Sequence, residues 1–184
     1  MQIMKVYSTD LTEIKIIEYE QNEDNRGYSY PIYNRSELEK AGIYFEYCME
    51  KVYCPKSAGT LYGIHFQNKP KAQTKLLYCM AGRGMDYAVD LRNYSKTYLQ
   101  WVSVELSEKN RKQIYIPEGF GHAFISLEDN TKIVMRYDEP FDERYSKQLR
   151  YDEPLIDIKY PFACPILAQH DLNAPFLCEC DINL

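Results

Sequence analysis

His65 and Lys75 are the two side chains whose types and spacing best fit proton chemistry. His65 lies in a strand-like run over residues 59–67, and Lys75 begins a second such run ten residues later. An imidazole removes protons near neutral pH, and an ammonium group stabilises negative charge on a neighbouring oxygen. Together they fit removal of a proton next to a carbonyl group.

Both side chains also have purely structural explanations. Regular alternation places His65 on one strand face with Leu61, Gly63 and Gln67. A buried histidine on such a face needs only a hydrogen-bond partner. A lysine at the start of a strand, such as Lys75, is commonly solvated. Residue type alone therefore leaves both interpretations open.

His122 and Asp171 are weaker candidates. His122 follows a proline turn between aromatic residues, which fits either a lined pocket or a capped turn. Asp171 has the sequence surroundings of a surface turn. A chain with three histidines and no His-x-His pair beside a glutamate has little capacity for a catalytic metal. Phosphate-binding glycine loops and the Gly-x-Ser-x-Gly element are also missing from the sequence.

Composition places the chain among ordinary globular proteins. Its 184 residues are 45% apolar, which predicts a single domain over residues 1–184 with a sizeable core. A net charge of −5 without a long basic run argues against nucleic acid as a partner. The sequence shows neither a membrane-spanning apolar run nor a signal pattern, so we expect a cytoplasmic protein with reduced cysteines.

Short strands between turn signals dominate the pattern. A capping-box spacing at Ser36 and Glu39, with Gly42 beyond it, predicts one short helix. Strands are predicted within residues 4–19, from Gly59 onward, and over residues 74–80, 85–91, 100–106, 112–116, 122–127 and 132–137. The tail after Pro154 reads as irregular chain with one or two turns. This pattern predicts a β-sandwich or barrel.

Several blocks, in order, resemble the dTDP-4-dehydrorhamnose 3,5-epimerase family of nucleotide-sugar epimerases. The resemblance runs from about residue 24 to 175. Its blocks are residues 24–27 (DNRG), 59–67 (GTLYGIHFQ), 72–76 (AQTKL), 86–92 (DYAVDLR), 104–110 (VELSEKN), 114–122 (IYIPEGFGH), 151–154 (YDEP) and 165–171 (PILAQHD). The resemblance implies a mainly β, cupin-type jelly-roll barrel with short peripheral helices. It also implies a homodimer and epimerisation without a cofactor.

The resemblance also implies roles for individual residues. His65 matches the catalytic base, Asp171 its paired carboxylate, and Lys75 the lysine facing the keto oxygen. His122 matches a histidine lining the sugar site, and Arg26 a residue that contacts the nucleotide. We further expect substrate contacts from Tyr28, Glu50, Tyr62, Gln67 and His170.

The sequence departs from the family pattern at the proton donor and at the nucleotide site. The family's tyrosine acid is matched by Met135, with Tyr137 two residues further on. Because a thioether cannot donate a proton, either Tyr137 is the acid or another group or water supplies the proton, and inversion at one or two carbons stays open. Tyr62 replaces a common arginine, and Glu50 and Val52 replace common amides. The nucleotide could therefore be thymidine, guanosine or cytidine diphosphate, and the sugar a deoxyhexose or a heptose.

The resulting prediction is an epimerase that inverts C-3, C-5 or both of a nucleotide-linked 4-keto sugar, in the biosynthesis of surface polysaccharide. A nucleotide-sugar ketoisomerase and a non-catalytic sugar-binding cupin are the alternatives. A metal oxygenase fits least, because its ligand set is incomplete.

Overall fold

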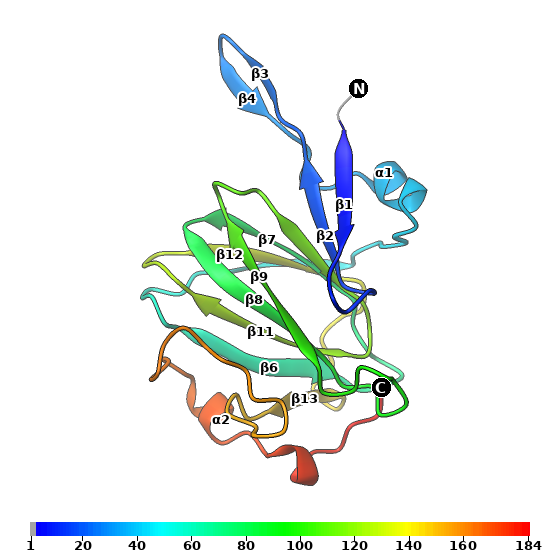
Figure 1. Ribbon diagram of the computed structural model, residues 1–184, viewed down its shortest axis with the longest axis vertical. Helices are drawn as coiled ribbons and strands as arrows, with labels where there is room; N and C mark the ends of the chain where they lie inside the picture. Colours follow the sequence, from blue (N-terminus) through cyan, green and yellow to red (C-terminus); the bar gives the residue numbers. More distant parts are fainter. Residues whose placement is uncertain (1–2) are drawn as a thin grey trace.

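The chain folds into two antiparallel sheets that face each other (Figure 1). The computed structural model describes residues 3–184, so the first two residues of the predicted domain lie outside it. The six-stranded sheet has the order β1 (Met4–Ser8), β2 (Lys15–Tyr19), β10 (Gln113–Ile116), β7 (Lys75–Ala81), β12 (Lys132–Tyr137), β5 (Met49–Tyr53). The five-stranded sheet has the order β13 (Ser146–Leu149), β6 (Leu61–Gln67), β11 (Phe120–Ser126), β8 (Arg83–Asp90), β9 (Trp101–Ser107). The prediction of a mainly β protein with short peripheral helices is confirmed.

The main core lies between the two sheets. Alternate residues of β7 and β12, such as Leu77 and Ile133, point inward and are fully buried, as the two-residue repeat of a strand requires. Phe124 of β11 faces them from the other sheet. Burial of these apolar side chains stabilises the sandwich by roughly 1.5–3 kcal/mol for each large residue.

Two predicted boundaries differ from the structure. The helix α1 (Arg35–Lys40) is capped by Asn34, whose side chain accepts a hydrogen bond from the backbone N–H of Glu37, and not by Ser36. Asparagine is as good an N-cap as serine and lies two residues earlier. The glycine turn is also tighter than predicted, because β7 ends at Ala81 and β8 begins at Arg83.

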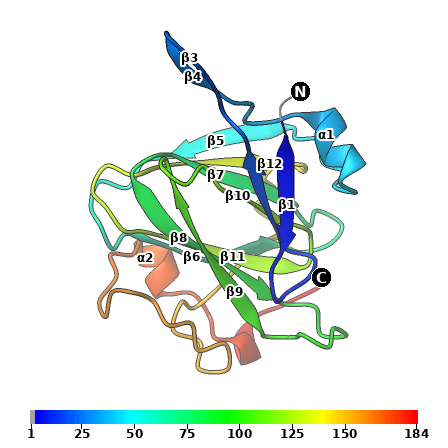
Figure 2. The ribbon, with the colours of Figure 1, turned by 45° about the horizontal axis from the view of Figure 1, so that its top comes forward.

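A hairpin of β3 (Asn22–Asp24) and β4 (Gly27–Ser29) projects away from both sheets, as Figures 1 and 2 show from two directions. Its six strand residues are all exposed. Gly27 has φ of 125°, a conformation that other residues rarely adopt. The hairpin therefore owes little of its position to packing against its own chain.

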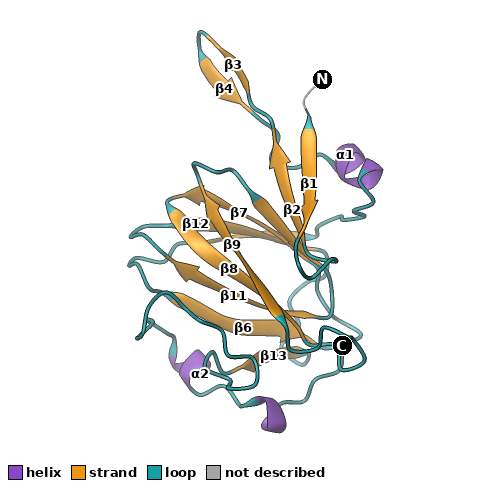
Figure 3. Ribbon diagram, in the orientation of Figure 1, coloured by secondary structure: helices purple, strands orange, loops and turns teal. Residues whose placement is uncertain are grey.

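The C-terminal tail is mostly irregular, as predicted, and covers the outer face of the five-stranded sheet (Figure 3). It contains α2 (Gln169–Leu172) and the short 3-10 helix η1 (Leu177–Glu179). Trp101 Nε1 donates to the carbonyl of Ile156 at 3.0 Å, and Leu61 N donates to the carbonyl of Ile166 at 2.9 Å. These bonds hold the tail along β9 and along β6, the strand that carries His65.

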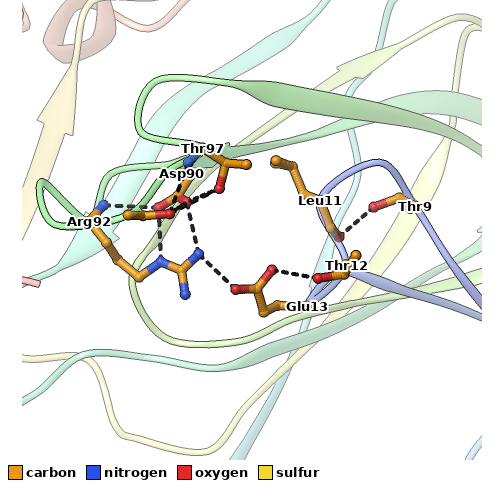
Figure 4. A network of polar contacts seen from close by, with 8 residues as sticks. Thr9, Leu11, Thr12, Glu13, Asp90, Arg92 and Thr97 are labelled. Carbon is orange, nitrogen blue, oxygen red and sulfur yellow. Dashed lines mark hydrogen bonds and ion pairs between the residues drawn. The ribbon is translucent and has the colours of Figure 1, made fainter.

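A polar network joins the turn before β2 to the loop after β8 (Figure 4). Asp90 is fully buried and accepts hydrogen bonds from Arg92, Ser95 and Thr97. Arg92 also bonds Glu13 at 3.1 Å.

No helix of the described residues is long and apolar enough to cross a membrane.

Candidate active site

A cavity of about 980 Å³ opens between the two sheets. The five-stranded sheet contributes a wall that includes Tyr62, His65, Gln67 and His122. The six-stranded sheet contributes Met49, Lys51, Tyr53, Lys75, Met135 and Tyr137, and the tail contributes residues that include His170 and Cys180. A smaller cavity of about 250 Å³ beside the C-terminus has no histidine or acidic side chain in its lining.

A β-bulge turns His65 into the cavity. The pairing of β6 with β11 shifts between His122, which lies opposite His65, and Phe124, which lies opposite Tyr62. The prediction that side chains alternate regularly along β6 is therefore wrong. The bulge inserts one extra residue, so the residues on either side of it no longer follow one alternation of strand faces. Tyr62 and His65 both line the cavity, whereas Leu61 packs in the outer apolar cluster under the tail.

Asp171 binds the ring of His65. Its Oδ1 lies 2.6 Å from His65 Nε2, and the carboxylate is 3% exposed. Burial opposes ionisation of this carboxyl, but His65, His170 and the Gly63 backbone N–H together outweigh it, so the pKa of Asp171 lies below its usual value. Because a carboxylate can only accept, Nε2 carries the proton and the Nδ1 lone pair is the ring's basic site.

Gly63 allows this contact. A Cβ at Gly63 would lie 3.1 Å from Asp171 Oδ1, which is tighter than an ordinary contact. The tail helix α2 can therefore bring its carboxylate down onto β6. The structure brings His65 and Asp171 together although 106 residues separate them.

Lys75 is buried and reaches across to the same strand. Its Nζ donates to the backbone carbonyl of His65 at 3.2 Å, and the residue is 5% exposed. Burial lowers the pKa of Lys75 to about 8, although the nearby Asp86 acts in the opposite direction. The lysine is thus a cavity residue and not a solvated strand start.

His122 lies behind this group and pairs with Asp86, at 2.9 Å from Nε2 to Oδ2. Both are buried; burial raises the pKa of Asp86 and lowers that of His122. Among the described residues, Asp86 Oδ1 has no hydrogen-bond partner. Asp86 was not among the residues predicted for the site, although an aspartate within a mostly buried strand is a signal that could have found it.

Tyr137 lines the cavity, but other side chains hold its hydroxyl. That hydroxyl lies 3.0 Å from the Tyr53 hydroxyl and 3.2 Å from the sulfur of Met135. Burial raises the pKa of Tyr137. Tyr53, which sequence reasoning missed, packs edge-on against Tyr62 with ring centroids 5.2 Å apart.

Two predicted binding residues have other partners. Gln67 lines the cavity, yet its amide binds the carbonyls of Lys71 and Pro140 and accepts from the Asp142 backbone N–H, so it shapes the adjacent loop. Glu50 does not line the cavity of its own chain. It points to the other face of β5 and bonds Arg136 Nε at 2.6 Å. Its neighbours Met49 and Lys51 face inward instead.

Arg26 and Tyr28 lie on the projecting hairpin, away from the cavity of their own chain. Arg26 is exposed and bonds Asp24, and Tyr28 is 58% exposed. The structure therefore does not bring them to His65 within one chain.

His170 does lie beside the histidine–carboxylate pair. Its ring stacks on that of His65 with centroids 6.0 Å apart, and its Nε2 is 3.5 Å from Asp171 Oδ1. The donor atoms of His65, His170 and Asp171 lie within 4.8 Å of one another. However, two atoms that each bind one ion at about 2 Å lie farther apart than the 2.6 Å between His65 Nε2 and Asp171 Oδ1. The arrangement therefore fits a hydrogen bond better than a metal site.

The family model of dTDP-4-dehydrorhamnose 3,5-epimerase matches residues 8–179. The chain belongs to this family. Among relatives bearing the family name, one from Sinorhizobium fredii is 33% identical over 98% of this chain and 93% of its own. Another, from Shigella flexneri, is 32% identical over 97% of this chain and 98% of its own.

Solved structures of epimerases share the fold. The dTDP-4-dehydrorhamnose 3,5-epimerase of Bacillus anthracis, with TDP and PPi bound, has a TM-score of 0.92 and 35% identity, covering 95% of this chain and 100% of that one. ChmJ, a 3'-monoepimerase from Streptomyces bikiniensis in complex with dTDP-quinovose, has a TM-score of 0.87 and 27% identity, covering 94% and 87%. The predicted family, its cupin-type jelly roll and the carbohydrate epimerase class are confirmed.

Proposed function

We propose that this protein inverts C-3, C-5 or both of a nucleoside diphosphate-linked 4-keto sugar, with no metal or other cofactor. The contact between His65 and Asp171 on the cavity wall is the observation that best supports this function. It provides an oriented base with an exposed lone pair beside a buried cation, Lys75. This is the set of groups that proton removal next to a ketone requires.

The reaction follows from these groups. The C-4 ketone acidifies the hydrogens on C-3 and C-5, and His65 Nδ1 removes one of them. Asp171 stabilises the imidazolium that forms, as the carboxylate does in a histidine–carboxylate pair. Lys75 stabilises the enolate oxygen. Return of a proton to the opposite face inverts the carbon, and the tyrosines of the six-stranded sheet lie on the wall that faces His65.

The substrate is a nucleotide sugar of surface polysaccharide biosynthesis, handled in the cytoplasm. The related structures hold TDP or dTDP-quinovose, which supports a pyrimidine nucleotide for those proteins. Here Tyr62 stands where an arginine is common, and Lys51, Lys147 and His170 line the cavity as diphosphate ligands. The nucleotide is thymidine, guanosine or cytidine diphosphate, and the sugar a deoxyhexose or a heptose.

The active form is a homodimer in which the projecting hairpin reaches the cavity of the other copy. The exposure of Arg26 and Tyr28, and their distance from their own cavity, support this arrangement. Arg26 then contacts the nucleotide in trans, where its guanidinium matches phosphate geometry.

Deuterium exchange tests the function. Wild-type protein in deuterated water, given a panel of 4-keto nucleotide sugars, should place deuterium next to the ketone without moving the carbonyl. His65→Asn should reduce this exchange by on the order of 10²–10⁴-fold. Asp171→Asn should keep partial activity, because Asp171 orients the base and does not carry the proton.

Ile64→Val is the matched control for a change in β6, because this side chain packs on the outer face. It should exchange like the wild type. Exchange in His65→Asn near the wild-type rate contradicts the assignment of the base. Movement of the carbonyl indicates a ketoisomerase, and binding without exchange indicates a sugar-binding protein.

A further inference from the structure

The cavity contains a hydroxyl group that can replace the missing tyrosine acid. Met135 occupies the family's tyrosine position, and a thioether cannot donate a proton. The neighbouring strand β5 brings Tyr53 to the same wall, hydrogen-bonded to Tyr137. We propose that Tyr53 is the acid that protonates the enolate and that Tyr137 positions it; this assignment rests on the proposed epimerase function.

The hydrogen bonds favour Tyr53 over Tyr137 as the donor. Tyr137 is 6% exposed, and its single proton can go either to Met135 or to Tyr53. The hydrogen bond between Tyr53 and Tyr137 can run in either direction, and a phenol oxygen is a better acceptor than a thioether, so Tyr137 can donate to Tyr53 in place of Met135. The Tyr53 proton is then free for a ligand in the cavity. Tyr53 is also less buried than Tyr137, since it lies on the edge strand of its sheet.

The location of Tyr53 suits inversion. Tyr53 belongs to the six-stranded sheet and His65 to the five-stranded sheet, so the two side chains enter the cavity from opposite walls. A sugar held between them loses a proton on one face and gains one on the other. Tyr62 fixes the ring of Tyr53 by edge-on packing.

The proton balance is complete without another reactant. His65 takes a hydrogen from carbon as a proton, and the electron pair of the broken C–H bond enters the enolate. The enolate carbon then forms a C–H bond with the Tyr53 proton, and the broken O–H bond leaves a phenolate stabilised by the Tyr137 hydroxyl. Water in the open cavity takes the proton from His65 and supplies one to Tyr53.

The test separates inversion from exchange. With dTDP-4-keto-L-rhamnose, and guanosine and cytidine diphosphate 4-keto sugars, as probes in deuterated water, NMR follows both events at C-3 and C-5. Tyr53→Phe should slow inversion on the order of 10²-fold while exchange by His65 stays near the wild-type rate. Tyr137→Phe should lower kcat for inversion about five- to tenfold with KM unchanged, as expected for loss of one hydrogen bond behind the acid.

Tyr94→Phe is the control for loss of a phenol hydroxyl, because Tyr94 is 70% exposed on a loop away from the cavity. Urea unfolding midpoints check that each variant folds. Inversion at the wild-type rate in Tyr53→Phe overturns the assignment, and so does a larger loss in Tyr137→Phe than in Tyr53→Phe. No exchange by the wild type with any probe instead overturns the proposed function itself, and this assignment with it.

Discussion

The buried charge of Lys75 lowers the stability of the fold and serves the proposed reaction. Burial lowers its pKa to about 8 from an ordinary value of 10.5, so the folded protein releases this proton before the unfolded chain does. The stability contribution of Lys75 therefore rises as the pH increases from about 8 to about 10.5, and at pH 7 the charged form destabilises the fold. The ammonium is retained at a site where a ketone oxygen would become negative.

Replacing Lys75 by methionine should therefore stabilise the protein and inactivate it. Lys75→Met should raise the free energy of unfolding at pH 7 by roughly 1–3 kcal/mol and lower kcat on the order of 10²–10³-fold. Urea unfolding and steady-state kinetics measure the two effects. In the wild type, kcat should fall as the pH passes above about 8, because the oxyanion donor loses its proton.

Lys71→Met is the control, since Lys71 is paired with Glu139 and more than a third exposed. It should leave both the unfolding free energy and the alkaline limb of kcat close to those of the wild type. A Lys75→Met protein that is less stable than the wild type at pH 7 contradicts a cost of burial at this site.

Residue types and spacing made His65 and Lys75 the first candidates and His122 and Asp171 weaker ones, and the family resemblance implied a role for each. The sequence could not show which partner each one meets, because those partners come from distant segments. Tyr53 was missed, because it is one of 18 tyrosines, most of which suit half-buried strands equally well.

At the scale of elements, the strands with clear apolar alternation were predictable, and the edge strands β5 and β13 were not. β5 carries Glu50 and Lys51 among apolar residues, and β13 (Ser146–Leu149) is short and only partly buried, so neither has a strong pattern. The bulge in β6 was also unpredictable, because it depends on pairing with β11. One shifted residue decides whether Tyr62 or Leu61 faces the cavity.

The buried Asp90 network gives a prediction for the loops at one end of the sheets. Burial alone would raise the pKa of Asp90, but hydrogen bonds from Arg92, Ser95 and Thr97 outweigh it and lower the pKa to about 2. The folded pKa lies below the ordinary value of 3.8, so this stability is present above pH 4 and is lost as the pH falls toward 2.

Asp90→Asn should destabilise the fold by about 3 kcal/mol at pH 7, because it leaves Arg92 without its buried partner. Urea titrations at pH 7 and pH 3 measure the change, and the difference from the wild type should shrink at pH 3. Asp157→Asn serves as the control, since Asp157 is exposed and asparagine tolerates its positive φ of 54°. Equal effects of the two substitutions would contradict a special role for the network.

At the scale of the whole molecule, the projecting hairpin predicts complementation between inactive variants. Arg26→Ala and His65→Asn should each lose activity alone. After mixing and subunit exchange, half of the dimers contain both chains and one of their two sites is intact, so activity should recover to about a quarter of wild type. Steady-state rates before and after mixing provide the measurement. If the hairpin served its own cavity, no mixture would recover.

The single tryptophan gives this molecule a built-in optical signal. Trp101 donates to Ile156 of the tail and lies 5.8 Å from Tyr87, whose ring contacts Tyr160 of the tail. Light absorbed by these two tyrosines is therefore transferred to Trp101, which lies where the tail packs on the five-stranded sheet. Release of the tail exposes the indole to water and moves its emission to longer wavelength. The same tail carries Asp171. A shift of the Trp101 emission to longer wavelength at low denaturant concentration would therefore report loss of the contact between Asp171 and His65 before the two sheets unfold.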